Sequence, residues 1–129
     1  MDASTASLHV TGIAVGGDGV ARDPDGQVIL VSGALPGETV TASFTGERRG
    51  VARAEVTGVV EAAPERVTPP CPFVAQGCGG CGWQHVTPAG QSDLRAAMVT
   101  DALVRLGGLV EPTVRQGPAL PATGYRTTL

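Results

Sequence analysis

Residues 8–60 consist of short apolar segments separated by glycine-rich turns, a pattern that leaves few possible folds. The segments lie at 8–15, 20–22, 27–31, 39–44 and 51–60. Asp25-Gly26 suits a tight hairpin turn, since both residue types tolerate positive φ. Five short, closely spaced strands are typical of a small closed or partly closed β-barrel. The predicted fold class is therefore mainly β, with a five-stranded barrel at its N-terminal end.

The last apolar segment alternates between polar and apolar residues. Its polar side holds Arg53, Glu55 and Thr57, and its apolar side holds Ala52, Ala54, Val56 and Val60. This alternation predicts a half-buried strand whose Arg53 faces water or a ligand. The chain has only two Phe, one Trp and one Tyr, so the core must be built mainly from Val, Leu, Ile and Ala.

The barrel is followed by a proline-rich linker and then by a helix. Four prolines between residues 62 and 72 exclude a helix there. Thr87-Pro88 is a helix start signal, with Thr as N-cap and Pro at the first helical position. Apolar residues then recur at helical spacing until Gly107-Gly108 and predict a packing face: Leu94, Ala97, Met98, Ala102 and Leu106.

These boundaries divide the chain into four parts. We expect a barrel at 1–62, a linker with a cysteine motif at 63–86, an amphipathic helix at 87–108 and a connector at 109–129 that opens into a missing domain. Residues 125–129 read as the start of a further strand, so the chain looks truncated. With 129 residues, it has no room for both a barrel and a nucleotide-binding catalytic domain.

Charge and hydropathy narrow the possible partners. The formal net charge is −3, and every basic residue is Arg, which argues against a strongly basic surface over the whole chain. Four arginines nevertheless cluster in the sequence: Arg48, Arg49, Arg53 and Arg66. Charge alone favours a solvated hairpin tip there. No apolar run approaches the length needed to cross a bilayer, and no signal peptide begins the chain, so we expect a soluble cytoplasmic monomer without membrane contact.

The cysteines carry the clearest chemical signal. Cys71, Cys78 and Cys81 are odd in number and closely spaced, which suits a metal or cluster site better than disulfides. Gly79 and Gly80 allow the tight backbone that directs two sulfurs to one centre. A four-iron cluster would need a fourth thiolate from outside the chain, whereas a zinc site could close on His85. Spacing alone leaves the two equal, with ordinary thiols as the third reading, and slightly favours a structural role for His85.

An ordered set of fragments resembles the N-terminal half of the RNA uracil-5-methyltransferases. The fragments span most of residues 8–106 and comprise Gly19-Val20-Ala21-Arg22, Gly33-Ala34-Leu35-Pro36-Gly37-Glu38, Ala52-Arg53-Ala54, Pro64-Glu65-Arg66-Val67, Cys71, Cys78-Gly79-Gly80-Cys81 and Gln84-His85. The resemblance implies that the barrel is a TRAM domain, of the oligonucleotide-binding type, that holds ribosomal or transfer RNA. The four clustered arginines would then grip phosphates.

The resemblance also implies a four-iron, four-sulfur (4Fe-4S) cluster held by the three cysteines and by a fourth further downstream. It shifts the balance from zinc to iron–sulfur, although six residues separate Cys71 from Cys78 where many members of the family have five. In the family, a separate domain binds S-adenosylmethionine and supplies a nucleophilic cysteine and a carboxylate base. No catalytic residue can be placed on this sequence, so we expect the chain alone to be inactive. The alternative is a stand-alone RNA-binding adaptor with a Cys3His zinc knuckle.

Overall fold

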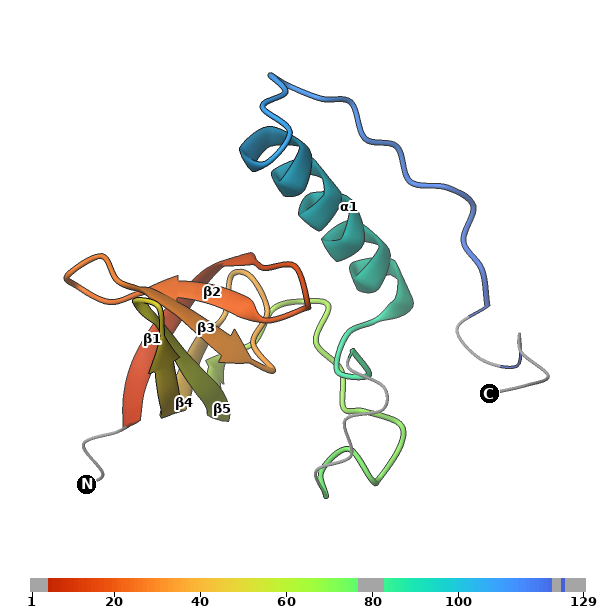
Figure 1. Ribbon diagram of the computed structural model, residues 1–129. Coiled ribbons are helices and arrows are strands. Elements are labelled where there is room, and N and C mark those ends of the chain that lie inside the picture. The colour runs from red at the N-terminus through yellow and green to blue at the C-terminus, as the bar shows by residue number, and fades with distance from the viewer. Residues whose placement is uncertain (1–4, 77–82, 122–123, 125–129) are drawn as a thin grey trace.

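The computed structural model describes residues 5–76, 83–121 and 124, which form a five-stranded barrel followed by a linker, a helix and an extended tail (Figure 1). The strands are β1 (Thr5–Ile13), β2 (Gly19–Arg22), β3 (Val28–Ser32), β4 (Thr39–Arg48) and β5 (Val51–Glu61), and the helix is α1 (Pro88–Arg105). The mainly β fold and all five expected strands are confirmed. Their ends differ by a few residues, chiefly because β4 runs on into the hairpin with β5.

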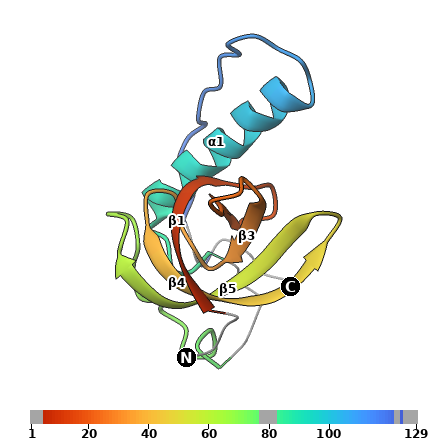
Figure 2. The same cartoon turned by 90° about the vertical axis from the view of Figure 1, so that its left-hand side faces the viewer.

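The barrel closes in the order β1-β2-β3-β5-β4, and β4 returns to pair with β1. All neighbouring strands are antiparallel except β3 and β5, which are parallel. The long strands β4 and β5 curl around the barrel (Figure 2), and their register shifts at three places along the pair. Such irregularities increase local twist and bending, which lets only five strands close into a barrel without an open edge.

The barrel core is aliphatic, as the shortage of aromatic residues requires. Its fully enclosed side chains include Val10, Ile29, Val31 and Val40, and alanines fill the positions where β4 and β5 bend across it. Ala52 and Ala54 face inward as expected, but Val60 is 65% exposed, so its predicted burial is wrong. The register shift between Thr39 and Val40 explains the error, since Val40 pairs with Val59 and Thr39 with Glu61, which leaves Val60 as the extra residue of a bulge.

The helix begins and ends where the sequence predicts. Thr87 is the N-cap, and its hydroxyl accepts a hydrogen bond of 3.1 Å from the amide of Gly90. The expected packing face is only partly correct: Leu94 is buried, whereas Leu106 is 80% exposed. The cause is visible in Figure 1, where α1 packs through its first turns and then leans away from the strands. Within the described residues, no helix combines the length and apolar character needed to cross a membrane.

A second hydrophobic cluster joins the barrel to the linker and to α1. It consists of Leu35, Ala63, Val86 and Leu94, with Ile13 and Trp83 packed against it. The tail after α1 runs back along the helix, where the Gln116 side chain donates a 2.8 Å hydrogen bond to Asp93. The strand expected at residues 125–129 lies outside the described residues.

Candidate RNA-binding surface and cysteine loop

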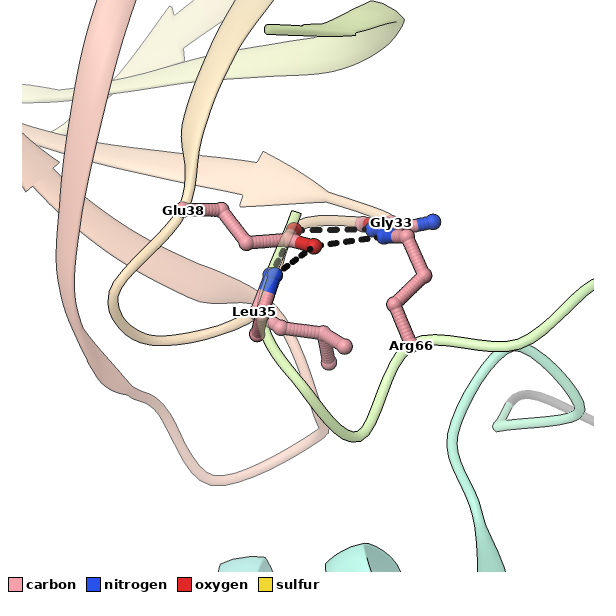
Figure 3. A network of polar contacts seen from close by, with 5 residues as sticks. Gly33, Leu35, Glu38 and Arg66 are labelled. Carbon is pink, nitrogen blue, oxygen red and sulfur yellow. Dashed lines mark hydrogen bonds and ion pairs between the residues drawn. The ribbon is translucent and has the colours of Figure 1, made fainter. Parts of the chain in front are cut away.

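A fully buried carboxylate anchors the linker to the barrel. Glu38 precedes β4 and is 0% exposed. Its two oxygens accept hydrogen bonds from Nε and Nη2 of Arg66, at 2.5 and 2.9 Å, and from the amides of Leu35 and Ala63. Arg66 Nη2 also donates to the carbonyl of Gly33 (Figure 3). A two-pronged ion pair with additional amide donors is the geometry in which a buried carboxylate can remain charged.

The protonation state of Glu38 follows from this arrangement. Burial alone would raise the pKa of Glu38, because it removes water from the charged form. The hydrogen bonds from Arg66 and from the amides of Leu35 and Ala63 act in the opposite direction and together prevail, so that the pKa lies below its ordinary value. Glu38 is therefore ionised at neutral pH.

Arg66 also stands at the base of the loop that carries the cysteines. It forms an isolated antiparallel bridge with Val86. On either side of that bridge, the amide of Val67 donates to the carbonyl of His85, and the amide of Thr87 donates to the carbonyl of Glu65. The chain thus leaves the barrel, makes a loop over residues 68–84 and returns to begin α1, with both ends of the loop held together.

The single tryptophan attaches this loop to the turn between β1 and β2. The indole Nε1 of Trp83 lies 3.4 Å from the carbonyl oxygen of Gly17, in the turn between β1 and β2. A Cβ on Gly17 would lie 2.7 Å from that nitrogen, so only glycine permits this contact. The guanidinium of Arg95 covers the indole ring at 5.5 Å from its centroid. Sequence reasoning did not identify Gly17, whose contact with Trp83 joins segments 66 residues apart.

One of the three predicted cluster ligands lies in the described part of the chain. Cys71 is half-buried, and its amide donates a 3.0 Å hydrogen bond to the side-chain oxygen of Gln84. Cys78 and Cys81 lie outside the described residues, which by themselves contain no group of three metal-ligating side chains. The structure therefore places Cys71 beside the segment that follows Cys81. The three cysteines remain predicted ligands.

His85, the fourth ligand of the zinc alternative, is half-buried near the Glu38–Arg66 pair. Burial and the positive charge of Arg66 lower its pKa, while the negative charge of Glu38 acts in the opposite direction. Within the described residues its Nε2 atom is buried and has no hydrogen-bond partner. The carbonyl contact expected of a purely structural histidine is therefore not formed by this ring nitrogen.

Two of the clustered arginines lie at the tip of the β4–β5 hairpin. Arg48 pairs with Val51 across the hairpin, and Arg49-Gly50 form the two-residue turn with φ angles of 55° and 79°. Two positive φ angles are the signature of a type I′ turn, which favours Asn, Asp or Gly over a long side chain. Arg49 therefore occupies a position that costs backbone energy, and the residue is exposed.

Arg53 lies on the same outward face as Arg48, two residues along β5 from Val51. Its guanidinium is 3.7 Å from the carboxylate of Asp18, and both side chains are substantially exposed. An exposed ion pair of this length contributes little to stability, about 0–1 kcal/mol. The structure thus brings Arg48, Arg49 and Arg53 onto one hairpin with their charges directed to solvent.

Arg66 is separate from these three. Its side chain is only 20% exposed, and its guanidinium is engaged by Glu38 and Gly33. Its predicted contact with RNA phosphate would require breaking that buried pair. The geometry instead gives it a positioning role at the loop base. Sequence reasoning missed Glu38 as its partner, and the only signal was an acidic residue directly after the Leu35-Pro36-Gly37 turn.

Comparison with known proteins identifies the barrel. A family model for the TRAM domain matches residues 3–57, which include all five strands up to the middle of β5. The barrel is a TRAM domain. Among solved structures, a conserved protein of Methanococcus maripaludis aligns with 44% of this chain and 80% of its own, at 28% identity and a TM-score of 0.40.

Relatives of this TRAM-containing chain extend well beyond the barrel. An uncharacterized RNA methyltransferase of Gloeobacter violaceus is 39% identical over 127 residues, 98% of this chain and 28% of the relative. The 23S rRNA (uracil(1939)-C(5))-methyltransferase RlmD of Alkalilimnicola ehrlichii is 42% identical over 92% of this chain and 26% of its own length. The RlmD of Paracidovorax citrulli is 38% identical over 92% and 25%. The resemblance to RNA uracil-5-methyltransferases is confirmed, and the chain spans about a quarter of the length of these relatives.

Proposed function

We propose that this chain is the RNA-recognition portion of an S-adenosylmethionine-dependent RNA uracil-5-methyltransferase that acts on ribosomal RNA. The observation that carries the proposal is the alignment with relatives named as 23S rRNA uracil-C5 methyltransferases, which covers the barrel, the cysteine loop and the helix together. A match limited to the barrel would have indicated an RNA-binding module of any kind. S-adenosylmethionine, bound by another part of the intact protein, would supply the methyl group.

The part of this chain in that reaction is binding and positioning. In our proposal, the arginines of the β4–β5 hairpin contact RNA phosphates, while Glu38 and Arg66 hold the linker in place. Phosphate contacts fix the register of an RNA without reading its sequence. Exposed guanidiniums suit this task, since Arg binds phosphate through two parallel hydrogen bonds. Neither the target uridine nor its catalytic base is assigned to this chain.

RNA binding by the hairpin can be tested with charge-neutralising variants of the full chain. Fluorescence anisotropy with a labelled single-stranded RNA would compare Arg48→Gln/Arg49→Gln with wild type. Arg115→Gln provides a control for the loss of one charge, since Arg115 is also exposed but lies in the tail. We expect the hairpin pair to weaken binding about tenfold or more, and the control to have little effect. Equal affinities for the hairpin and control variants would overturn the hairpin assignment.

We further propose that Cys71, Cys78 and Cys81 hold a 4Fe-4S cluster together with a cysteine from outside this chain. The closed base of the loop and the hydrogen bond between Cys71 and Gln84 support a shared centre, because they bring the first cysteine close to the segment that follows the third. A cluster of this kind supplies either a structural crosslink or an electron-transfer centre. The competing zinc site would use the buried Nε2 of His85, which has no other partner among the described residues.

Metal analysis distinguishes the iron–sulfur cluster from the zinc site. The intact protein, purified without oxygen, should contain iron and acid-labile sulfide in equal amounts and show broad absorbance in the visible range. Substituting His85→Gln should leave that iron content unchanged. A colourless protein with one equivalent of zinc that is lost in the His85 variant would support the zinc knuckle instead.

The parent activity is tested on the intact protein. Incubation with a ribosomal RNA transcript and S-adenosylmethionine labelled on its methyl group should give labelled 5-methyluridine in the digested RNA. The 129-residue chain alone should give none. Label in another nucleoside, or transfer by the short chain alone, would contradict this proposal.

A further inference from the structure

A groove between α1 and the barrel is separate from the hairpin surface described above. It lies where the last turns of α1 overhang the outer face of β1, β2 and β3 (Figure 1). Its volume is about 330 Å³. Its lining is Gly12, Ile13, Ala14, Val20, Arg22, Val28, Leu30, Asp101 and Arg105. Pockets of about 300 Å³ and above are the size that small ligands or single groups of a larger ligand occupy.

The floor of the groove is apolar because of the strand alternation. On β2 and β3, Ala21, Ile29 and Val31 point into the core, so the residues between them point outward. Val20, Val28 and Leu30 are such residues, and each is only half-buried. The outer face of a barrel strand usually carries polar residues where it meets water. Three adjacent apolar positions on this outer face therefore indicate a surface that can bind an apolar group of a ligand.

Arginines stand on the two sides of this floor. On the barrel side, Arg22 is exposed and uses one donor to reach the carbonyl of Gly26 at 3.1 Å. On the helix side, Arg105 pairs with Asp101 at 2.7 Å, with side-chain exposures of 60% and 43%. An exposed pair of this kind is easily rearranged, since it contributes only about 0.3–0.5 kcal/mol. Both guanidiniums can thus turn toward an anion in the groove.

The groove is continuous with the hairpin surface. Val20 pairs with Leu30 across β2 and β3, and Leu30 pairs with Arg53 across β3 and β5. Gln27, in the β2–β3 turn beside Arg22, donates to the carbonyl of Gly50 in the β4–β5 turn. A strand of nucleic acid that leaves Arg48 and Arg53 therefore meets the groove next.

We infer that the groove binds one unpaired nucleotide of the RNA, with its base or ribose on Val20, Val28 and Leu30 and its flanking phosphates on Arg22 and Arg105. The inference rests on the proposed function and names a second contact site for the same RNA. An apolar floor between two cations matches a nucleotide, which carries a flat apolar face between two anions. The tail does not line the groove, since it descends on the side of α1 away from the barrel (Figure 1), where Gln116 contacts Asp93.

The test uses variants of the full chain that keep the local hydrogen bonds. Arg22→Gln and Arg105→Gln each retain a donor for Gly26 and Asp101, and Arg115→Gln removes one such charge from the tail, so it is compared with each single variant as well as with the pair. Anisotropy with a labelled single-stranded oligouridylate should show about tenfold weaker binding for the double groove variant and a salt dependence reduced by about one unit of slope. The Arg115 control should match wild type.

The other possible results also decide between the groove and the hairpin as RNA-binding sites. If the hairpin pair Arg48→Gln/Arg49→Gln weakens binding while the groove pair behaves like the control, the groove assignment is overturned and RNA binding stands. If the wild-type chain binds no RNA, both fail. Photocrosslinking with 4-thiouridine should label peptides from β2, β3 or α1, and labelling confined to the β4–β5 hairpin overturns the inference. Stronger protection of β2 and β3 from hydrogen exchange in the RNA-free intact protein than in the 129-residue chain would mean that polypeptide occupies the groove, which also overturns the inference.

Discussion

Glu38 and Arg66 lie 28 residues apart in the sequence and meet at the edge of the barrel interior through two hydrogen bonds. Glu38 directly precedes β4, and Arg66 stands at the base of the cysteine loop. Because the carboxylate is fully buried, it cannot exchange Arg66 for water without a large cost. The position of the loop relative to the barrel is therefore fixed by an interaction inside the protein rather than by surface contacts.

Removing the charge of Glu38 should destabilise the fold strongly. We expect Glu38→Gln to lower the free energy of unfolding by about 3 kcal/mol, because it leaves the Arg66 guanidinium partly buried without its counter-ion. Urea denaturation followed by circular dichroism measures the change. Asp101→Asn is the matched control, since it breaks an exposed pair with Arg105 and should cost less than about 1 kcal/mol. Comparable losses in the two variants would show that the buried pair contributes no more to the free energy of unfolding than the exposed pair does.

The same pair predicts an acid-sensitive stability. The pKa of Glu38 is lowered in the folded protein from an ordinary value of 4.5, so the unfolded chain binds this proton more readily than the folded one. The stabilisation is therefore complete above about pH 4.5 and is lost as the pH falls from there through the folded-state pKa. Unfolding measured across this range should fall more steeply with acid in wild type than in Glu38→Gln. Parallel curves would mean that Glu38 does not carry the effect.

The contact between Gly17 and Trp83 can be probed by adding a single methyl group. Gly17→Ala meets the indole at 2.7 Å and also forces alanine to φ +98°, whereas Gly16→Ala requires φ +103° with no atom within 4 Å. The difference between the two variants isolates the clash. We expect a loss of about 1–2 kcal/mol for Gly16→Ala from the backbone alone, and a further loss for Gly17→Ala.

Fluorescence provides an independent readout of that contact, since Trp83 is the only tryptophan. Displacement of the indole from the barrel should shift its emission to longer wavelength in Gly17→Ala but leave it unchanged in Gly16→Ala. Identical spectra and stabilities for the two variants would argue that Trp83 does not rest on Gly17.

A substitution at the hairpin tip should raise the stability of the fold while it lowers the affinity for RNA. Arg49 adopts φ 55° in a turn that glycine adopts without steric cost. We expect Arg49→Gly to stabilise the fold by about 0.5–1 kcal/mol while weakening RNA binding. Thermal unfolding and anisotropy on the same preparation measure the two effects. A variant that is less stable than wild type would refute the strain at Arg49, and unchanged RNA affinity would refute its functional role.

Local sequence patterns predicted most of the fold, because turns, helix caps and strand alternation are set by residues that are neighbours in the sequence. The Thr87 cap before Pro88 and the alternation of Ala52 and Ala54 are of this kind, and both appear in the structure. Asp25 and Gly26 lie in the connection between β2 and β3, but that connection is longer than a tight hairpin turn, and of the two only Gly26 has a positive φ, of 87°. The errors at Val60 and Leu106 arise from longer-range effects. A register shift between β4 and β5 leaves Val60 as the exposed extra residue of a bulge, and α1 leans away from the barrel beyond its first turns.

The candidate site was less accessible to sequence reasoning. Three of the clustered arginines could be grouped because they lie within one hairpin. Proximity in the sequence groups Arg66 with them, but the environment of Arg66 is set by Glu38, and no periodicity in the sequence connects these two residues. The groove beside Arg22 and Arg105 was missed for the same reason, since its two sides come from β2 and the end of α1.

The most direct test of RNA recognition is the salt dependence of RNA binding by the wild-type chain. Anisotropy titrations with a single-stranded RNA at several potassium chloride concentrations give the slope of log K against log salt. Three or more arginine–phosphate contacts predict a slope of about −2 or steeper, at about −0.7 per phosphate for a single strand. Binding that does not change with salt, or no binding at low salt, would contradict the assignment of this barrel to RNA.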